Sequence, residues 1–256
     1  MTRIKFSRSS YRTELLYGVQ PVCEALRQRK REFSELFLKR GKNNSGRISY
    51  IRNLAKEIGI AVNEVPGNKL TEMCPNAVHQ GVVLRCSFLP FSPISDLTLT
   101  LKSKLPLIVV LDQIEDPHNL GAVIRTCGFF DVNAVVLSKD HSCGLTPVVS
   151  KSSSGVVEWL TVISITNLTR FLNKQKSEGY WVVGLTEESN NSISKLVRDK
   201  PIILVLGNEG RGIRPLIRKQ CDWLVSIAGN PEVASLNVSN AAAIALNYFY
   251  TLPEST

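Results

Sequence analysis

Continuous apolar runs recur through the second half of the chain. Residues 107–111 and 202–206 contain no polar side chain, which is the pattern of a strand buried on both faces of a sheet. Apolar periodicity predicts further strands at 134–137, 181–185 and 224–227, and helices at 120–130, 168–178 and 238–250. Strands that alternate with helices predict an α/β fold with a mostly parallel sheet covered on both sides.

The first half of the chain has shorter elements. Helical spacing occurs at 22–28 and 48–58, and short strands are predicted at 36–38, 61–65 and 82–84. Between 87 and 106 three prolines occur among several serines and threonines, which is typical of a linker. We therefore predict, in chain order, a basic arm, a small α/β domain, a linker and a larger α/β domain: 1–12, 13–88, 89–105 and 106–256.

The positive charge is concentrated in the N-terminal quarter. Residues 1–60 contain 14 lysines and arginines against 5 acidic residues, which accounts for the whole net charge of +9. A localised basic field indicates a polyanion partner, most simply nucleic acid, and a merely solvated surface is the alternative. The candidate RNA-binding residues are Arg27, Arg29, Lys30, Arg31, Lys39, Arg40 and Lys42.

Cysteine and apolar patterns exclude several classes of protein. The six cysteines are scattered without a C-x-x-C pair, which argues against a disulfide framework and against a zinc module, so no metal is expected. No apolar run approaches the roughly 18 residues that a membrane span needs. The first twelve residues are basic, rich in serine and free of acid; this pattern faintly resembles an organellar targeting segment, and a basic RNA-binding arm explains it equally well.

Three polar motifs lie after predicted strands or before predicted helices, and this placement suggests a binding or catalytic site. They are Asp116-Pro-His-Asn-Leu-Gly121 running on to Arg125, Gly207-Asn-Glu-Gly-Arg-Gly212, and Ser235-Leu-Asn-Val-Ser239. Each comes after a predicted strand, and ligands bind beyond the carboxyl ends of strands in open α/β sheets. We therefore expect the motifs to converge on one edge of the sheet.

Each motif also has a purely structural interpretation. Asn119 is placed to cap the helix at 120–130, and Asn237 or Ser239 to cap the helix at 238–250. The glycines at 207–212 match neither the dinucleotide fingerprint nor a P-loop, so a plain turn is the alternative there. Arg125 is the only charged residue between Asp116 and Asp131, which is more than a solvated face requires and favours an anion partner over a structural ion pair.

Together the three motifs resemble those of the SpoU (TrmH-like) branch of the SPOUT RNA 2′-O-ribose methyltransferases, over about residues 106–250. Val78-His-Gln-Gly81 resembles the end of the L30e-like substrate-binding domain of the subgroup that acts on guanosine in large-subunit ribosomal RNA. Residues 142–153, and Met73-Cys74 before His79, are most similar to the mitochondrial members. Asp131, where the family usually has Gly, and Asn240, where it has a small apolar residue, depart from the pattern.

The resemblance implies a trefoil-knotted α/β domain, S-adenosylmethionine as cofactor, ribosomal RNA as partner, and a homodimer whose active site draws on both chains. It implies cofactor contacts from Gly207, Ile227 and Leu236. It implies a catalytic group formed by Asn119, Arg125, Glu209, Ser235 and Asn237. The compartment implied is the mitochondrial matrix, with the cytoplasm as the alternative.

Methyl transfer to a ribose hydroxyl requires alignment of two groups and removal of a proton, and it needs no metal. A guanidinium keeps its proton in proteins, so we expect Arg125 to clamp an RNA phosphate rather than to act as the base. Asn119 and Asn237 would orient Arg125 and the cofactor's carboxylate end, and Glu209 would pair with Arg125 or receive a ribose hydroxyl. The alternatives are a transfer-RNA ribose methyltransferase and a non-catalytic RNA-binding assembly factor.

Overall fold

The computed structural model describes residues 12–41, 46–100, 105–230, 232–233 and 235–252. The chain divides into two compact units, residues 1–90 and 91–256. Each unit has its own sheet, and the two units are described separately. The predicted arm falls almost wholly outside the described residues, as does Lys42.

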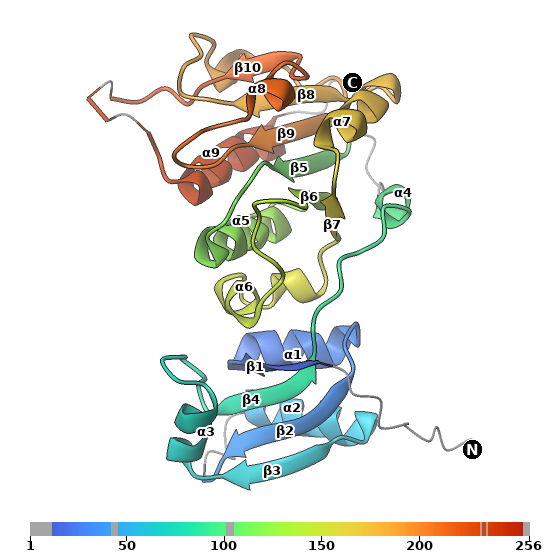
Figure 1. Cartoon of the computed structure of the whole chain (residues 1–256), viewed down its shortest axis with the longest axis vertical. Helices are drawn as coiled ribbons and strands as arrows, with labels where there is room; N and C mark the ends of the chain where they lie inside the picture. The colour runs from blue at the N-terminus through green and yellow to red at the C-terminus, as the bar shows by residue number, and fades with distance from the viewer. Residues whose placement is uncertain (1–11, 42–45, 101–104, 231, 234, 253–256) are drawn as a thin grey trace. The chain divides into compact units, whose positions relative to one another are not determined.

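The first unit is a mixed four-stranded sheet of order β1-β4-β2-β3 (Figure 1). β4 (Val82–Ser87) pairs antiparallel with β1 (Thr13–Tyr17) and β2 (Phe33–Lys39), and β3 (Ala61–Val65) runs parallel to β2. One main core joins this sheet to α1 (Val19–Gln28) and α2 (Gly46–Ile58). A smaller core around Leu70 lies under α3 (Gly67–Met73).

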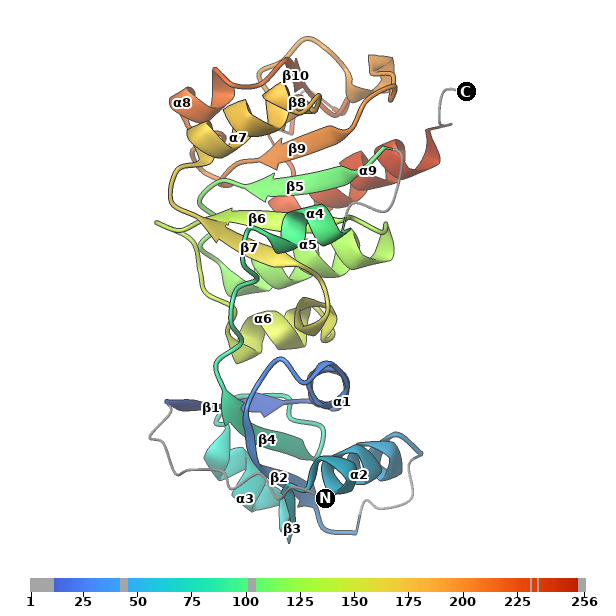
Figure 2. The ribbon, with the colours of Figure 1, turned by 90° about the vertical axis from the view of Figure 1, so that its right-hand side faces the viewer.

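The second unit contains a six-stranded, wholly parallel sheet of order β10-β8-β9-β5-β6-β7 (Figure 2). Its strands are β5 (Leu107–Leu111), β6 (Ala134–Ser138), β7 (Val162–Ile165), β8 (Trp181–Leu185), β9 (Ile202–Leu206) and β10 (Trp223–Val225). The predicted fold class, a mostly parallel α/β domain beside a smaller α/β domain, is confirmed. The trefoil knot stays a prediction.

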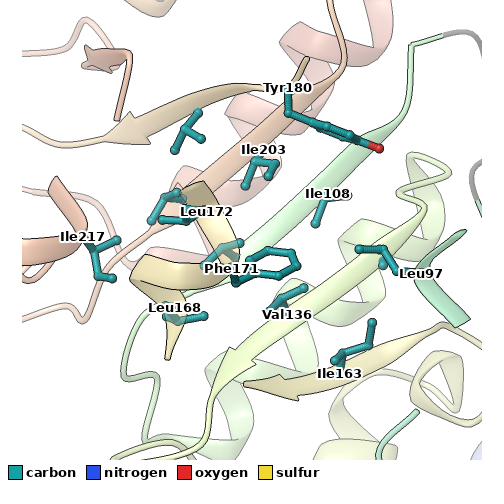
Figure 3. Packing of buried hydrophobic residues seen from close by; sticks show 14 of the residues in the cluster. Leu97, Ile108, Val136, Ile163, Leu168, Phe171, Leu172, Tyr180, Ile203 and Ile217 are labelled. Carbon is teal, nitrogen blue, oxygen red and sulfur yellow. The ribbon is translucent and has the colours of Figure 1, made fainter. Parts of the chain in front are cut away.

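Helices cover both faces of the large sheet. On one face α7 (Leu168–Ser177) places Phe171 and Leu172 over β5, β6 and β9, as Figure 3 shows, and α8 (Pro215–Arg218) adds Ile217 to this core. On the other face α5 (Pro117–Phe129) packs against α9 (Val238–Thr251) and α6 (Pro147–Ser152). The central strands are therefore buried on both sides, which explains their unbroken apolar runs.

The segment that we predicted as a linker contains α4 (Asp96–Thr100), whose Leu97 is 4% exposed in the core of the second unit. The backbone N–H of Ser92 also donates to the carbonyl of Val162, which joins the start of this segment to β7. Pro, Ser and Thr indicated a linker from composition alone. Leu97 nevertheless docks on the core of the second unit, because burying one leucine is worth about 2 kcal/mol.

Two short 3-10 helices complete the unit, η1 (Val156–Glu158) and η2 (Ile193–Lys195). Sequence periodicity missed these, and it also missed β1, β7, α3, α6 and α8, which are elements of three to seven residues. Periodicity needs several turns or alternations to become visible. The long and strongly apolar elements were the ones it found.

Candidate active site

The three predicted motifs meet at the carboxyl edge of the large sheet. Nδ2 of Asn119, in the first turn of α5, donates to Oε1 of Glu209 at 2.9 Å. Nδ2 of Asn237, just before α9, donates to the same oxygen at 2.5 Å and to Oδ1 of Asn119 at 3.0 Å. The backbone N–H of Val238 also points to this carboxylate, at 3.3 Å. Side chains far apart in the sequence thus form one closed polar network.

Helix capping orients two members of this network. Asn237 is the N-cap of α9, and its Oδ1 accepts from the backbone N–H of Ser239 at 2.9 Å and from the Ser239 hydroxyl at 2.6 Å. Asn119 does not cap α5, as the sequence had suggested. Asp116 is the cap there, and its side chain accepts from the backbone N–H of His118 at 3.0 Å. Because the cap is supplied three residues earlier, the Asn119 amide is available for Glu209.

A tight turn presents Glu209. Asn208 and Gly212 exchange backbone hydrogen bonds of 3.1 and 2.8 Å across the turn. A Cβ atom on Gly207 would lie 2.2 Å from the carbonyl carbon of Gly212, so only glycine allows this approach. The glycine spacing therefore has a structural cause, and that structure holds Glu209 toward the two asparagines.

A half-buried ion pair behind this turn was missed by the sequence analysis. Asp112 directly follows β5 and is fully buried. Its carboxylate accepts from the backbone N–H, Nε and Nη2 of Arg214 at 2.9, 2.8 and 2.7 Å. A carboxylate at the end of an unbroken apolar strand was the signal that could have found it. The pair ties the end of β5 to the chain just beyond Gly212.

Arg125 lies outside the polar network of its own chain. Its side chain is exposed and makes no hydrogen bond or ion pair with any residue that the structure describes. It lines a shallow cavity of about 530 Å³ beside Phe129, Phe130 and Trp159. The predicted pairing of Glu209 with Arg125, and the orientation of Arg125 by the two asparagines, are thus not formed within one chain.

The other motif residues lie at the edge of this network. Ser235 is exposed, Leu236 is 45% exposed, and Gly207 is half-buried beside Asn208. Ile227 is half-buried, two residues beyond β10 and thus at the same carboxyl edge of the sheet. Asp131, a departure from the family pattern, has a φ of 52°, which is the left-handed conformation that favours Gly and that Asp tolerates.

The basic residues of the first unit divide into two groups. Arg31 is 4% exposed, and its guanidinium binds Oε1 of Glu14 at 2.5 Å and the carbonyl of Ser87 at 2.9 Å. This burial removes Arg31 from the predicted RNA-binding set. Arg27 pairs with Glu24 at 3.1 Å and keeps half its surface exposed. The remaining described candidates are all exposed: Arg29, Lys30, Lys39 and Arg40.

Metal and thiol chemistry find no support in the described residues. No group of three His, Cys, Asp or Glu residues among them could hold a metal ion. Their cysteines are free thiols, and burial raises the pKa of Cys143 to about 11. None of the described helices combines the length and the apolar character that crossing a lipid bilayer requires.

Comparison with known proteins identifies the fold and the family. The family described as SpoU rRNA Methylase matches residues 106–247, and the one described as RNA 2′-O ribose methyltransferase substrate binding matches residues 15–92. The structure of the SpoU methyltransferase AviRb from Streptomyces viridochromogenes, in complex with AdoMet, superimposes with a TM-score of 0.77. That match covers 93% of this chain and 89% of that one at 21% identity, and so supports the fold alone.

Curated relatives align along nearly their whole length. A putative TrmH family tRNA/rRNA methyltransferase, YacO of Bacillus subtilis, is 32% identical over 94% of this chain and 96% of its own. The 23S rRNA (guanosine-2′-O-)-methyltransferase RlmB of Haemophilus influenzae is 36% identical over 91% and 96%. Both relatives are bacterial. With one family match covering residues 106–247 and these alignments, the chain belongs to the SpoU rRNA methylase family.

Proposed function

We propose that this protein transfers a methyl group from S-adenosylmethionine to the 2′-oxygen of a guanosine ribose in large-subunit ribosomal RNA. The observation that carries the proposal is the closed network of Asn119, Glu209 and Asn237. A fold alone does not require three polar side chains from three separate segments to meet in this way. The relatives named for guanosine methylation support the substrate class.

The residues present suit the proposed cofactor. Leu236 and Ile227 offer apolar surface for its adenine ring, and Leu236 keeps 45% of its surface exposed at an edge that is otherwise polar. The positive end of the α9 dipole suits its carboxylate end. When bound, S-adenosylmethionine supplies a sulfonium-activated methyl group that a ribose oxygen can displace in line.

The chain's own residues have separate tasks in this scheme. The Glu209 carboxylate, held by two amide groups, can accept a hydrogen bond from a ribose hydroxyl and so fix its direction. A guanidinium cannot take up the proton at neutral pH, so Arg125 binds an RNA phosphate and stabilises the developing charge. The proton leaves through that phosphate or through water.

The exposed face that carries Arg125 supports a homodimer as part of this proposal. Arg125 shares its face with Phe129, which is 79% exposed, Trp159, which is 40% exposed, and Tyr250, which is 58% exposed. Such a cluster of exposed aromatic side chains is typical of a protein interface. Pairing of two chains through this face would let Arg125 of the partner subunit reach the polar network.

The dimer is tested by Phe129→Glu, which places a charge on the most exposed aromatic side chain of this face. We expect sedimentation to change from a dimer to a monomer and methyl transfer to fall with it. Phe88→Glu is the matched control, because Phe88 is 53% exposed and lies in the first unit. A wild-type protein that sediments as a monomer at micromolar concentration would contradict this part of the proposal.

The function itself is tested by tritiated methyl transfer to large-subunit ribosomal RNA and, separately, to transfer RNA. We expect incorporation into ribosomal RNA at a guanosine. The methyl group on its 2′-oxygen then blocks reverse transcription at low nucleotide concentration. Incorporation into transfer RNA alone would establish the first alternative. Tight RNA binding without transfer to either would establish the non-catalytic alternative.

The basic surface of the first unit supplies RNA affinity in this proposal. Charge contacts of this kind bind without sequence choice and weaken with salt. Neutralising Arg29, Lys39 and Arg40 together should weaken binding and reduce the salt slope by about two to three. An unchanged slope would exclude this surface.

The mitochondrial matrix is a separate part of the proposal and rests on the basic, serine-rich first twelve residues and on the likeness of residues 142–153. A fusion of the first thirty residues to a fluorescent protein, expressed in a eukaryotic cell, tests it. Diffuse cytoplasmic fluorescence would favour the alternative compartment.

A further inference from the structure

A second cavity of the large unit is unused by the chemistry above. It has a volume of about 420 Å³ and lies at the carboxyl ends of β6 and β7. Six of its lining residues matter here: Phe91, Ser138, Lys139, Ser142, Ser164 and Thr166. The cavity is within the size range of sites that bind small organic groups.

We propose that this cavity receives an unstacked nucleobase of the RNA substrate, with Phe91 as its stacking surface. The inference rests on the proposed function, because it takes RNA as the substrate. Proteins that read single-stranded RNA stack splayed bases on aromatic rings and bind their edges with polar side chains. The cavity contains both kinds of group.

The aromatic wall is held in place. Phe91 is 39% exposed, so one part of its surface is available and the rest is packed. The next residue, Ser92, donates its backbone N–H to the carbonyl of Val162 at 2.8 Å, which joins this segment to β7. An aromatic side chain fixed by its backbone loses little entropy when a base stacks on it.

The polar wall has hydrogen-bonding capacity to spare. The side chains of Lys139, Ser164 and Thr166 make no hydrogen bond with any residue in the described part of the chain. Hydroxyl groups can donate to or accept from any base, whereas a lysine ammonium group favours O6 and N7 of guanine. This donor set therefore fits a guanine best.

The cavity is joined to the proposed active site through one residue. The backbone N–H of Gln113 donates to Oγ of Ser138, in the cavity wall, at 3.0 Å. The carbonyl of Gln113 accepts from Nδ2 of Asn208, the neighbour of Glu209, at 2.9 Å. Gln113 has a φ of 62°, an uncommon conformation for this residue type, so both bonds help to hold a strained backbone. A base in the cavity would thus lie next to the loop that presents Glu209.

The test uses the full chain and in vitro transcribed large-subunit ribosomal RNA that contains 6-thioguanosine or 4-thiouridine. After irradiation, we expect a cross-link on the peptide that carries Phe91. We also expect Phe91→Leu to weaken RNA binding by about ten-fold, whereas Phe91→Trp retains the affinity. Phe88→Leu is the matched control, because it removes an exposed ring three residues away, outside the cavity.

Two results would overturn the inference. One is an absence of cross-links to the cavity together with unchanged affinity of Phe91→Leu. The other is a changed salt slope of RNA binding in Lys139→Gln together with an unchanged affinity in Phe91→Leu. That combination would mean that the cavity binds a phosphate. Methyl transfer is measured on the same RNA. A wild-type protein that cross-links at Phe91 but transfers no methyl group contradicts the proposed function and leaves the cavity inference standing.

Discussion

The two ends of helix α5 present opposite kinds of surface. At its first turn Asn119 is engaged within the chain by Glu209 and Asn237, and Asp116 caps the helix. At its last turns Arg125 and Phe129 are exposed, beside an apolar cavity. One end forms its polar contacts within a single chain, and the other has the composition of an interaction surface.

We propose that this difference lets one motif carry two separate tasks. Asn119 and Arg125 are six residues apart, which places them on different sides of the helix. Among the described residues of one chain, Arg125 lies outside the network that Asn119 joins. In the proposed homodimer, the first turn of α5 in one subunit would face the arginine of the other and so complete one site.

Removal of Glu209 should have the largest effect on activity. In Glu209→Ala the two amide groups and the Val238 N–H lose their common acceptor. We expect methyl transfer to fall by about 100- to 1000-fold while the fold is retained, because loss of one oriented polar group in an active site costs about that much. Glu178→Ala, which removes an exposed carboxylate that among the described residues pairs with Lys174 alone, should leave the rate unchanged. A loss of less than about three-fold would show that the first turn of α5 has only a structural role.

Arg125→Ala should reduce transfer about as strongly as Glu209→Ala. A heterodimer of one Arg125→Ala subunit and one Asn119→Ala subunit then tests whether the two ends of α5 serve one shared site. In a purified heterodimer of the two variants, one site keeps Asn119 from one subunit and Arg125 from the other. We expect about half of the wild-type activity from this heterodimer, and almost none from either variant homodimer. A heterodimer as inactive as its parents would contradict the shared site.

The sequence predicted more about the first turn of α5 than about its last turns. Motif order identified Asn119, Glu209 and Asn237, and their convergence followed from the rule that loops after parallel strands share one edge. The pair of Asp112 with Arg214 and the burial of Arg31 were not visible, because each depends on a tertiary contact. The cap Asp116 is a local contact followed by Pro117 at the helix start, and the sequence analysis overlooked that signal. The six-residue spacing did place Arg125 and Asn119 on different sides of the helix, but it could not show that the polar network closes without Arg125.

Stability should depend on the ion pair behind the turn that presents Glu209. Asp112→Ala leaves the Arg214 guanidinium and its backbone N–H without their acceptor. We expect a loss of about 2 to 3 kcal/mol in unfolding free energy, which is below the value for a wholly buried pair because the Arg214 side chain is 40% exposed. Chemical denaturation measures this loss. Glu188→Ala, which frees the half-exposed Arg218 in the same way, should cost less than about 1 kcal/mol.

The smallest effect concerns a thiol near the same end of α5. Burial, assisted by the negative charge of Asp116, raises the pKa of Cys143 to about 11. The thiolate is the reactive form, so at pH 8 we expect iodoacetamide to modify Cys143 at least about ten-fold more slowly than a free cysteine. The rate should rise as the pH approaches 11, and Asp116→Asn should increase it at pH 8, because removal of the carboxylate charge lowers the thiol pKa. Mass spectrometry of the Cys143 peptide follows both changes. If Asp116→Asn left the labelling rate unaltered, the cap carboxylate would act on its helix alone. It would then have no influence on the thiol of Cys143, which lines the cavity at the ends of β6 and β7.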